Sequence, residues 1–113
     1  MKIVMALIRN DRVRQVQEAL LKTGIKGFTM SGTLGMGELR NLDPTGNEDL
    51  VQHIRVEIAL PDVWVETAVR VLRNSAATGH PGDGLIFVYP LERAIKIRNG
   101  EENEQILLPS VSD

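Results

Sequence analysis

The stretch Thr78-Gly79-His80-Pro81-Gly82-Asp83-Gly84-Leu85-Ile86-Phe87-Val88 joins a glycine-rich loop to an apolar run, and the rest of the chain is organised around it. Three glycines, a proline and an aspartate fall within seven residues, a composition typical of a turn, and the apolar run predicts a strand. Gly82 and Gly84 lack a Cβ atom, so an anionic ligand can come close to the main-chain N–H groups there. The pattern fits both a phosphate-binding loop and an ordinary Asp-Gly turn between a helix and a strand.

Composition limits the classes of protein that this chain can represent. Its 113 residues are enough for one domain but few for an enzyme with a deep cleft, so oligomerisation would help it. A formal net charge of −2 gives no general attraction to DNA or to an anionic bilayer, and we expect no nucleic-acid partner. The lack of cysteine excludes disulfides and thiolate chemistry. No apolar stretch is long enough to span a bilayer, so we expect a cytoplasmic protein that is not membrane-embedded.

The chain begins with a predicted strand and a predicted helix. Residues 2–8 form a nearly continuous apolar run, typical of a strand buried in the middle of a sheet. Apolar residues then recur at helical spacing from residue 12, with Asn10 or Asp11 as the N-cap and Gly24 as the C′ residue. The face of this helix that covers the sheet would carry Val13, Val16, Leu20 and Leu21.

Two alternating segments predict the second and third strands. Residues 28–34 and 53–60 alternate apolar with polar side chains, as in strands that turn one face to the core. The connection between them, about residues 36–52, is polar, rich in turn residues and longer than most connections in a compact domain. We expect it to be a mobile loop, and loops of this kind usually carry function.

The last part of the chain predicts a second helix and a fourth strand. Helical spacing runs to residue 77 with Asp62 as the N-cap, residues 85–89 form the strand, and residues 94–98 form a short extended tail. The order βαββαβ predicts an α+β, ferredoxin-like fold with a four-stranded antiparallel sheet and both helices on one face. The other face would expose an apolar patch, so we expect the chain to associate through it.

These patterns resemble the PII signal-transduction proteins over nearly the whole chain. The C-terminal half has Thr78-Gly79-x-x-Gly82-Asp83-Gly84-x-Ile86-Phe87-Val88 followed by Ala94-Ile95-Lys96-Ile97-Arg98-Asn99-Gly100-Glu101. The N-terminal part has Lys2-Ile3, Glu18-Ala19-Leu20 and Gly35-Met36-Gly37 in the expected order and spacing. The resemblance implies a homotrimer with adenine nucleotide in the clefts between subunits. It also implies a target enzyme or membrane transporter that the mobile loop contacts.

Glycine and basic segments define a candidate nucleotide site. Gly35-Met36-Gly37, Gly82-Asp83-Gly84 and the pair Lys96 and Arg98 lie in segments that the strand order brings around one cleft. The glycine loop offers N–H donors to phosphate, and the two cations, spaced by two, would point to the same side of an extended chain. With the resemblance, the predicted nucleotide-binding set is Thr29, Gly35, Met36, Gly37, Glu57, Gly82, Asp83, Gly84, Leu85, Lys96 and Arg98.

A catalytic or metal centre finds little support in the sequence. The only histidines are His53 and His80, no serine or threonine stands in a nucleophile context, and we expect both histidines to lie on the solvated surface. We therefore predict no enzyme activity, no metal and no resident cofactor.

Departures from the PII pattern point to a different ligand preference. Glu38 and Leu39 stand where the family has arginine and glutamine, Leu85 where it has a lysine, and His53 where it has a further lysine. These changes remove positive charge from positions that face a γ-phosphate or 2-oxoglutarate. Each charge-assisted hydrogen bond is worth roughly 1.5–3 kcal/mol, so ATP should lose its advantage over ADP and AMP.

The resulting hypothesis is a PII-like sensor of ADP or AMP, with ATP bound more weakly. The freed phosphate space can hold a small anion such as bicarbonate, with His53 as its anion-binding residue. The predicted loop is shorter than the usual PII loop and has no tyrosine, since the one tyrosine is Tyr89. Two alternatives stay open: an ordinary nitrogen-regulatory PII protein that binds ATP and 2-oxoglutarate, and a ligand-free trimeric interaction scaffold.

Overall fold

The computed structural model describes residues 1–36, 41–42, 48–49 and 51–109. The main elements are β1 (Lys2–Ile8), α1 (Val13–Lys22), β2 (Phe28–Gly35), β5 (Val51–Leu60), α2 (Val65–Ala76) and β6 (Leu85–Pro90). Inside the segment predicted as a mobile loop, β3 (Asn41–Leu42) and β4 (Glu48–Asp49) form a short antiparallel pair. The other residues from 37 to 50 lie outside the described ones, so the predicted mobility stays a prediction.

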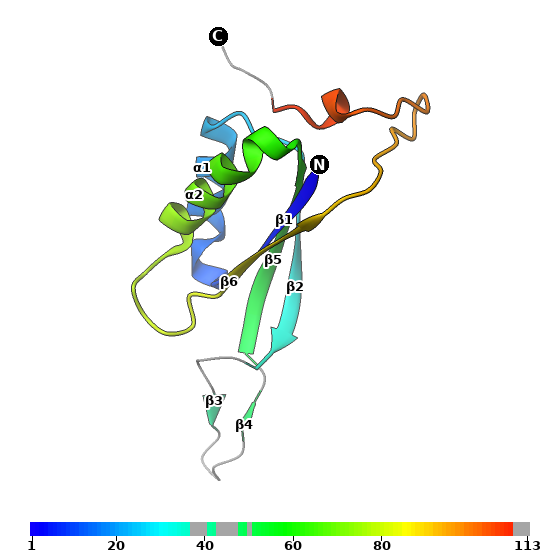
Figure 1. Cartoon of the computed structure of the whole chain (residues 1–113). Coiled ribbons are helices and arrows are strands. Elements are labelled where there is room, and N and C mark those ends of the chain that lie inside the picture. Colours follow the sequence, from blue (N-terminus) through cyan, green and yellow to red (C-terminus); the bar gives the residue numbers. More distant parts are fainter. Residues whose placement is uncertain (37–40, 43–47, 50, 110–113) are drawn as a thin grey trace.

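The four long strands form one antiparallel sheet in the order β2-β5-β1-β6. Both α-helices pack on the same face of this sheet (Figure 1). Register places Met5 of β1 between Glu57 of β5 and Phe87 of β6, and Glu57 opposite Thr29 of β2. The predicted ferredoxin-like fold is therefore confirmed.

The core lies between the helices and the sheet face that they cover. Alternate residues of the two central strands face the helices because successive side chains of a strand point to opposite faces. Leu20 of α1 and Leu72 of α2 are fully buried against them, but Leu21 is 45% exposed, so its predicted place on the buried face of the helix is wrong. A one-residue step turns a helix by about 100°, which carries Leu21 off that face. The sheet residues buried in this core are Val4, Ala6, Ile8, Val56, Ile58 and Leu60.

The helices begin differently from the sequence prediction. A 3-10 turn, η1 (Asn10–Arg12), precedes α1, and neither Asn10 nor Asp11 caps the helix with its side chain. A second 3-10 turn, η2 (Asp62–Trp64), precedes α2, and Asp62 pairs with the N-terminal ammonium at 2.9 Å instead of capping. This ion pair lowers the pKa of Asp62. Backbone bonds within the two turns, rather than side-chain oxygens, start the helices.

The end of α1 agrees with the prediction. Gly24 has a φ of 91° and its N–H donates to the Leu21 carbonyl, while the N–H of Ile25 donates to the Leu20 carbonyl. This is a Schellman motif, in which glycine takes the left-handed position and the next apolar residue packs against the helix. Ile25 is accordingly fully buried.

The segment after β6 is a loop that turns back on itself. The prediction of an extended tail over residues 94–98 is wrong, because residues 97–99 form a turn. The N–H of Lys96 donates to the Glu101 carbonyl at 2.8 Å, and the N–H of Gly100 donates to the Lys96 carbonyl at 2.8 Å. Arg93 also pairs with Glu102 across this turn. The chain then forms η3 (Glu104–Leu107), which packs near the end of β5.

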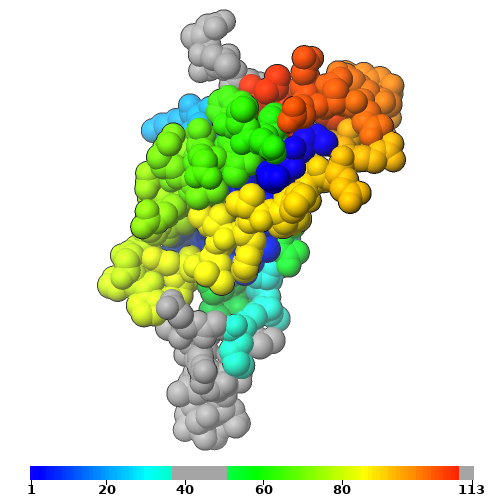
Figure 2. Space-filling model, in the orientation of Figure 1, coloured from blue at the N-terminus to red at the C-terminus, as the bar shows by residue number. Residues whose placement is uncertain are grey.

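The sheet face away from the helices carries apolar side chains within the described residues. Leu85, Phe87 and Tyr89 of β6 are 62%, 43% and 41% exposed, and Met5 and Leu7 of β1 are half-buried beside them. The strand β6 is an edge strand that crosses the surface next to α2 (Figure 2). Neither helix of the described chain is long and apolar enough to cross a membrane.

Candidate functional site

The loop between α2 and β6 is built around the carboxylate of Asp83. Its Oδ2 accepts from the N–H groups of Thr78 at 2.8 Å and Gly79 at 2.9 Å. Its Oδ1 accepts from the Thr78 hydroxyl and from Arg9 Nε, the latter at 2.8 Å. The Thr78 hydroxyl, the Arg9 guanidinium and these N–H groups hold the pKa of Asp83 well below its usual range. The carboxylate therefore acts as an internal anion that closes the loop.

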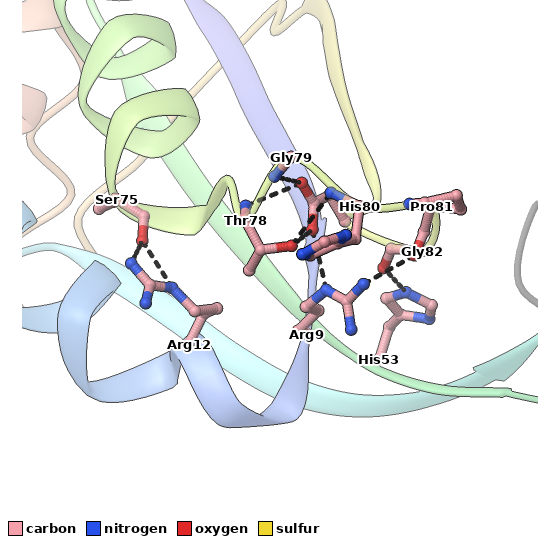
Figure 3. A network of polar contacts seen from close by, with 10 residues as sticks. Arg9, Arg12, His53, Ser75, Thr78, Gly79, His80, Pro81 and Gly82 are labelled. Atoms are coloured by element: carbon pink, nitrogen blue, oxygen red, sulfur yellow. Dashed lines mark hydrogen bonds and ion pairs between the residues drawn. The ribbon is translucent and has the colours of Figure 1, made fainter.

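Two further donors hold carbonyl groups of the same loop (Figure 3). Arg9 Nη2 donates to the Pro81 carbonyl at 2.7 Å, and His53 Nε2 lies 3.0 Å from the Gly82 carbonyl. A carbonyl oxygen can only accept, so Nε2 carries the hydrogen. Arg9 follows β1 and His53 belongs to β5, so the loop is tied to two central strands of the sheet.

The last glycine of the loop is required by its surroundings. Gly84 has a φ of +104°, and a Cβ atom placed on it would lie 1.7 Å from the Leu7 carbonyl oxygen. Gly79 and Gly82 also have positive φ, at 82° and 92°. Such angles are strained for residues with a side chain. The motif is thus a turn, as one sequence interpretation held, and the phosphate-binding interpretation stays a prediction.

The cleft lies at the loop end of the uncovered sheet face and has a volume of about 490 Å³. It brings together six of the predicted site residues, namely Gly35, Met36, His53, Gly82, Gly84 and Leu85. The other lining residues are Leu7, Thr33, Leu34 and Arg55. Its wall is mostly apolar at the β1 and β6 side, with cationic and imidazole groups contributed by β5.

Several predicted residues lie elsewhere in the single chain. Thr29 and Glu57 face each other on β2 and β5, further along the sheet than the residues that line the cleft. The carboxylate of Asp83 is turned to Arg9, and Asp83 lines a separate groove between α2 and β6. Gly37 lies outside the described residues, as do Glu38 and Leu39.

The basic pair leaves from the opposite end of the sheet. Pro90, at the end of β6, pairs with Lys2, whereas Leu85, next to the glycine loop, pairs with Leu7. The chain carrying Lys96 and Arg98 therefore departs away from the loop of its own subunit (Figure 1). Within one chain the basic pair does not complete the cleft. Arg98 lies in a turn, so the predicted alignment of Lys96 and Arg98 along an extended chain is wrong.

The structure revises the expectation for one histidine and adds two arginines to the site. His80 is exposed as expected, but His53 is half-buried and bonded to the loop. Arg9 and Arg55 were not among the predicted site residues. Arg55 stands two positions after His53 in an alternating strand, so period-two spacing was a signal for it. Arg9 had no local signal, because its partners lie 72 and 74 residues away.

Fold and site together define the class of this protein: a ferredoxin-like α+β domain with a glycine-loop cleft at the end of an uncovered sheet face. The sequence profile described as "Nitrogen regulatory protein P-II" matches residues 1–101. The chain therefore belongs to the PII family of signal-transduction regulatory proteins.

Relatives with that name are similar to the chain over most of its length. The Nitrogen regulatory protein P-II of Haemophilus influenzae is 37% identical over 112 residues, which is 95% of this chain and 100% of the relative. The protein of the same name from Rhizobium etli is 38% identical over the same shares. Nitrogen regulatory protein P-II 1 of Escherichia coli K12 is 37% identical over 92% of this chain and 97% of its own length. The predicted family is confirmed.

Proposed function

We propose that this protein is a regulatory sensor that binds an adenine nucleotide in the cleft beside the glycine loop. One observation carries the proposal. Within the described residues, the N–H groups of Gly82 and Gly84 have no hydrogen-bond acceptor, although both residues line the 490 Å³ cleft. Unpaired N–H groups of a glycine loop are donors for phosphate oxygens. The signal would pass to a target enzyme or transporter through residues 36–52.

The charges around the cleft favour a short phosphate chain. Arg55 is the one permanent cation among the described residues that line the cleft. Its Nη1 lies 3.8 Å from Glu57 Oε1, so the Glu57 carboxylate partly neutralises the positive charge that a phosphate would meet. Leu85 lines the cleft where the family has a lysine. Two missing charge-assisted bonds cost roughly a hundredfold in affinity. We therefore expect ADP and AMP to bind more tightly than ATP, and the free phosphate space to accept a small anion such as bicarbonate. His53 would hold this anion through Nδ1 in its doubly protonated form, because Nε2 already bonds to the Gly82 carbonyl.

The site is proposed to be complete only in a homotrimer. The exposed apolar residues of the uncovered sheet face supply an association surface. Lys96 and Arg98 lie far from the glycine loop of their own chain and are exposed, so we expect them to reach the nucleotide of a neighbouring subunit.

Calorimetry with AMP, ADP and ATP, each with and without bicarbonate, tests the ligand preference. We expect ADP and AMP to bind at least tenfold more tightly than ATP. Replacing Lys96 and Arg98 together by alanine should weaken ADP binding by over tenfold. Arg14→Ala, which removes an exposed cation from α1, is the matched control and should have no effect. ADP binding that survives the double substitution would contradict the proposed trimeric site.

An ordinary nitrogen-regulatory function is the second candidate. The relatives named above carry the name Nitrogen regulatory protein P-II, and this name supports it. It requires tight ATP binding that 2-oxoglutarate strengthens, and the same calorimetry with 2-oxoglutarate distinguishes the two. A protein that binds none of these nucleotides would instead act as a ligand-free interaction scaffold.

A further inference from the structure

Two side chains, one just after β1 and one in β5, hold consecutive carbonyl groups of the glycine loop. Arg9, just after β1, donates a hydrogen bond to the Pro81 carbonyl, and His53, in β5, donates one to the Gly82 carbonyl. We infer that Arg9 and His53 are positioning residues that fix the direction of the N–H groups of the loop before any ligand binds. The predicted effect of these two residues on nucleotide affinity rests on the proposed nucleotide site, but their predicted effect on the order of the loop does not.

Peptide geometry links the two carbonyls to the N–H groups. Within the described residues all peptide bonds are trans, so each C=O points opposite to the N–H of the next residue. Holding the Pro81 carbonyl on Arg9 directs the Gly82 N–H away from Arg9. Holding the Gly82 carbonyl on His53 likewise directs the Asp83 N–H away from His53. Both N–H groups lack an acceptor within the described residues, so no hydrogen bond of their own competes with these two contacts.

The Arg9 contact depends on the shape of the guanidinium. Nε binds Asp83 Oδ1 at 2.8 Å while Nη2 binds the Pro81 carbonyl at 2.7 Å, so one side chain joins two points of the loop. The Arg9 and Asp83 side chains are only 23% and 25% exposed, which protects the pair from solvent screening. A lysine has one nitrogen and cannot reproduce the fork.

The His53 contact depends on a hydrogen at Nε2 and not on a positive charge. The main chain of His53 is also held, because its carbonyl accepts from the Thr33 hydroxyl of β2 at 3.1 Å. His53 therefore connects β2, β5 and the loop through one residue. A neutral donor at the Nε2 position should serve equally well.

Paired substitutions separate the donor from the charge. His53→Gln keeps a neutral donor near the Nε2 position, whereas His53→Asn places its amide near Nδ1 and leaves the Gly82 carbonyl without a donor. Hydrogen exchange of the peptide over residues 78–84, measured without ligand, should accelerate about two- to twelvefold in the asparagine variant, the range for one hydrogen bond. The glutamine variant should stay within twofold of the wild type.

A second pair of variants repeats the test at the Arg9 contact. Arg9→Lys should accelerate exchange in the same peptide. Arg12→Lys is the matched control, because Arg12 also uses its fork on a backbone carbonyl, that of Ser75 at 2.7 and 3.1 Å, but does not touch the loop (Figure 3). This pair also carries the test if a His53 variant does not fold.

ADP affinity gives the functional measurement. His53→Asn and Arg9→Lys should weaken ADP binding by a similar two- to twelvefold, and His53→Gln should not. Equal effects of the glutamine and asparagine variants, or unchanged exchange in Arg9→Lys, would overturn the inference. If the wild-type protein does not bind ADP, the proposed function fails, and hydrogen exchange alone decides whether the two residues position the loop.

Discussion

Replacing Gly84 by alanine should destabilise the fold more than the same change at Gly79, a glycine of the same loop with open surroundings. The new Cβ would lie 1.7 Å from the Leu7 carbonyl oxygen, and real Cβ atoms stay at least 3.0 Å from such atoms. The two atoms must therefore move apart by about 1.3 Å. Leu7 cannot easily yield, because it lies in β1 between Arg55 of β5 and Leu85 of β6.

The expected magnitude combines two costs. A φ of +104° is strained for alanine by about 1–3 kcal/mol. Moving the loop by more than an ångström should also break at least one or two of the hydrogen bonds that close it, each worth about 0.5–1.5 kcal/mol net. The free energy of unfolding should therefore fall by roughly 2–5 kcal/mol.

Two other glycines are matched controls. Gly79→Ala has φ strain but open space, since none of the described atoms lies within 4 Å of its added Cβ, so it should cost only about 1–3 kcal/mol. Gly35→Ala has open space and no positive φ, so it should stay within about 1 kcal/mol of the wild type. Urea denaturation at one protomer concentration measures all three, because the stability of an oligomer depends on concentration. A Gly84→Ala protein no less stable than Gly79→Ala would refute the steric argument.

Three further predictions follow from charge and exposure. Because the pKa of Asp83 is lowered from 3.8 in the folded state, its ionised form stabilises the fold above that value, and the contribution is lost as the pH falls toward the lowered pKa. The stability difference between wild type and Asp83→Asn should therefore be constant near neutral pH and shrink below about pH 4 in urea titrations; a difference that stays constant in acid would contradict this. Leu85→Lys should restore a cation at the cleft and raise ATP affinity relative to ADP by about tenfold in calorimetry, and an unchanged ratio would count against the charge argument. Phe87→Glu on the uncovered sheet face should shift the protein to a smaller species in light scattering, whereas Val63→Glu, at an exposed apolar residue of η2, should not; a trimer unchanged by Phe87→Glu would exclude this face as the interface.

Some residues of the candidate cleft could be predicted from a local motif. The others could not, because their place depends on how distant segments pack together. Three lining residues from one short segment, Gly82, Gly84 and Leu85, belong to a recognisable local motif. Arg9 follows β1 and Arg55 belongs to β5, and only the packing of the sheet against the loop brings them near that motif. Lys96 and Arg98 were placed by assuming an extended chain, which the Lys96–Glu101 backbone bond replaces with a turn.

The sequence by itself determined the order of strands and helices, the face of the sheet that the helices cover, and the left-handed glycine that ends α1. Each of these depends on periodicity or on the backbone freedom of one residue, which are local properties. Only the tertiary structure decided that Asp83 turns inward to Arg9, that His53 bonds to Gly82, and that 3-10 turns start both helices. These features depend on contacts between residues distant along the chain, or on competition between backbone and side-chain bonds, and neither is written in the local pattern.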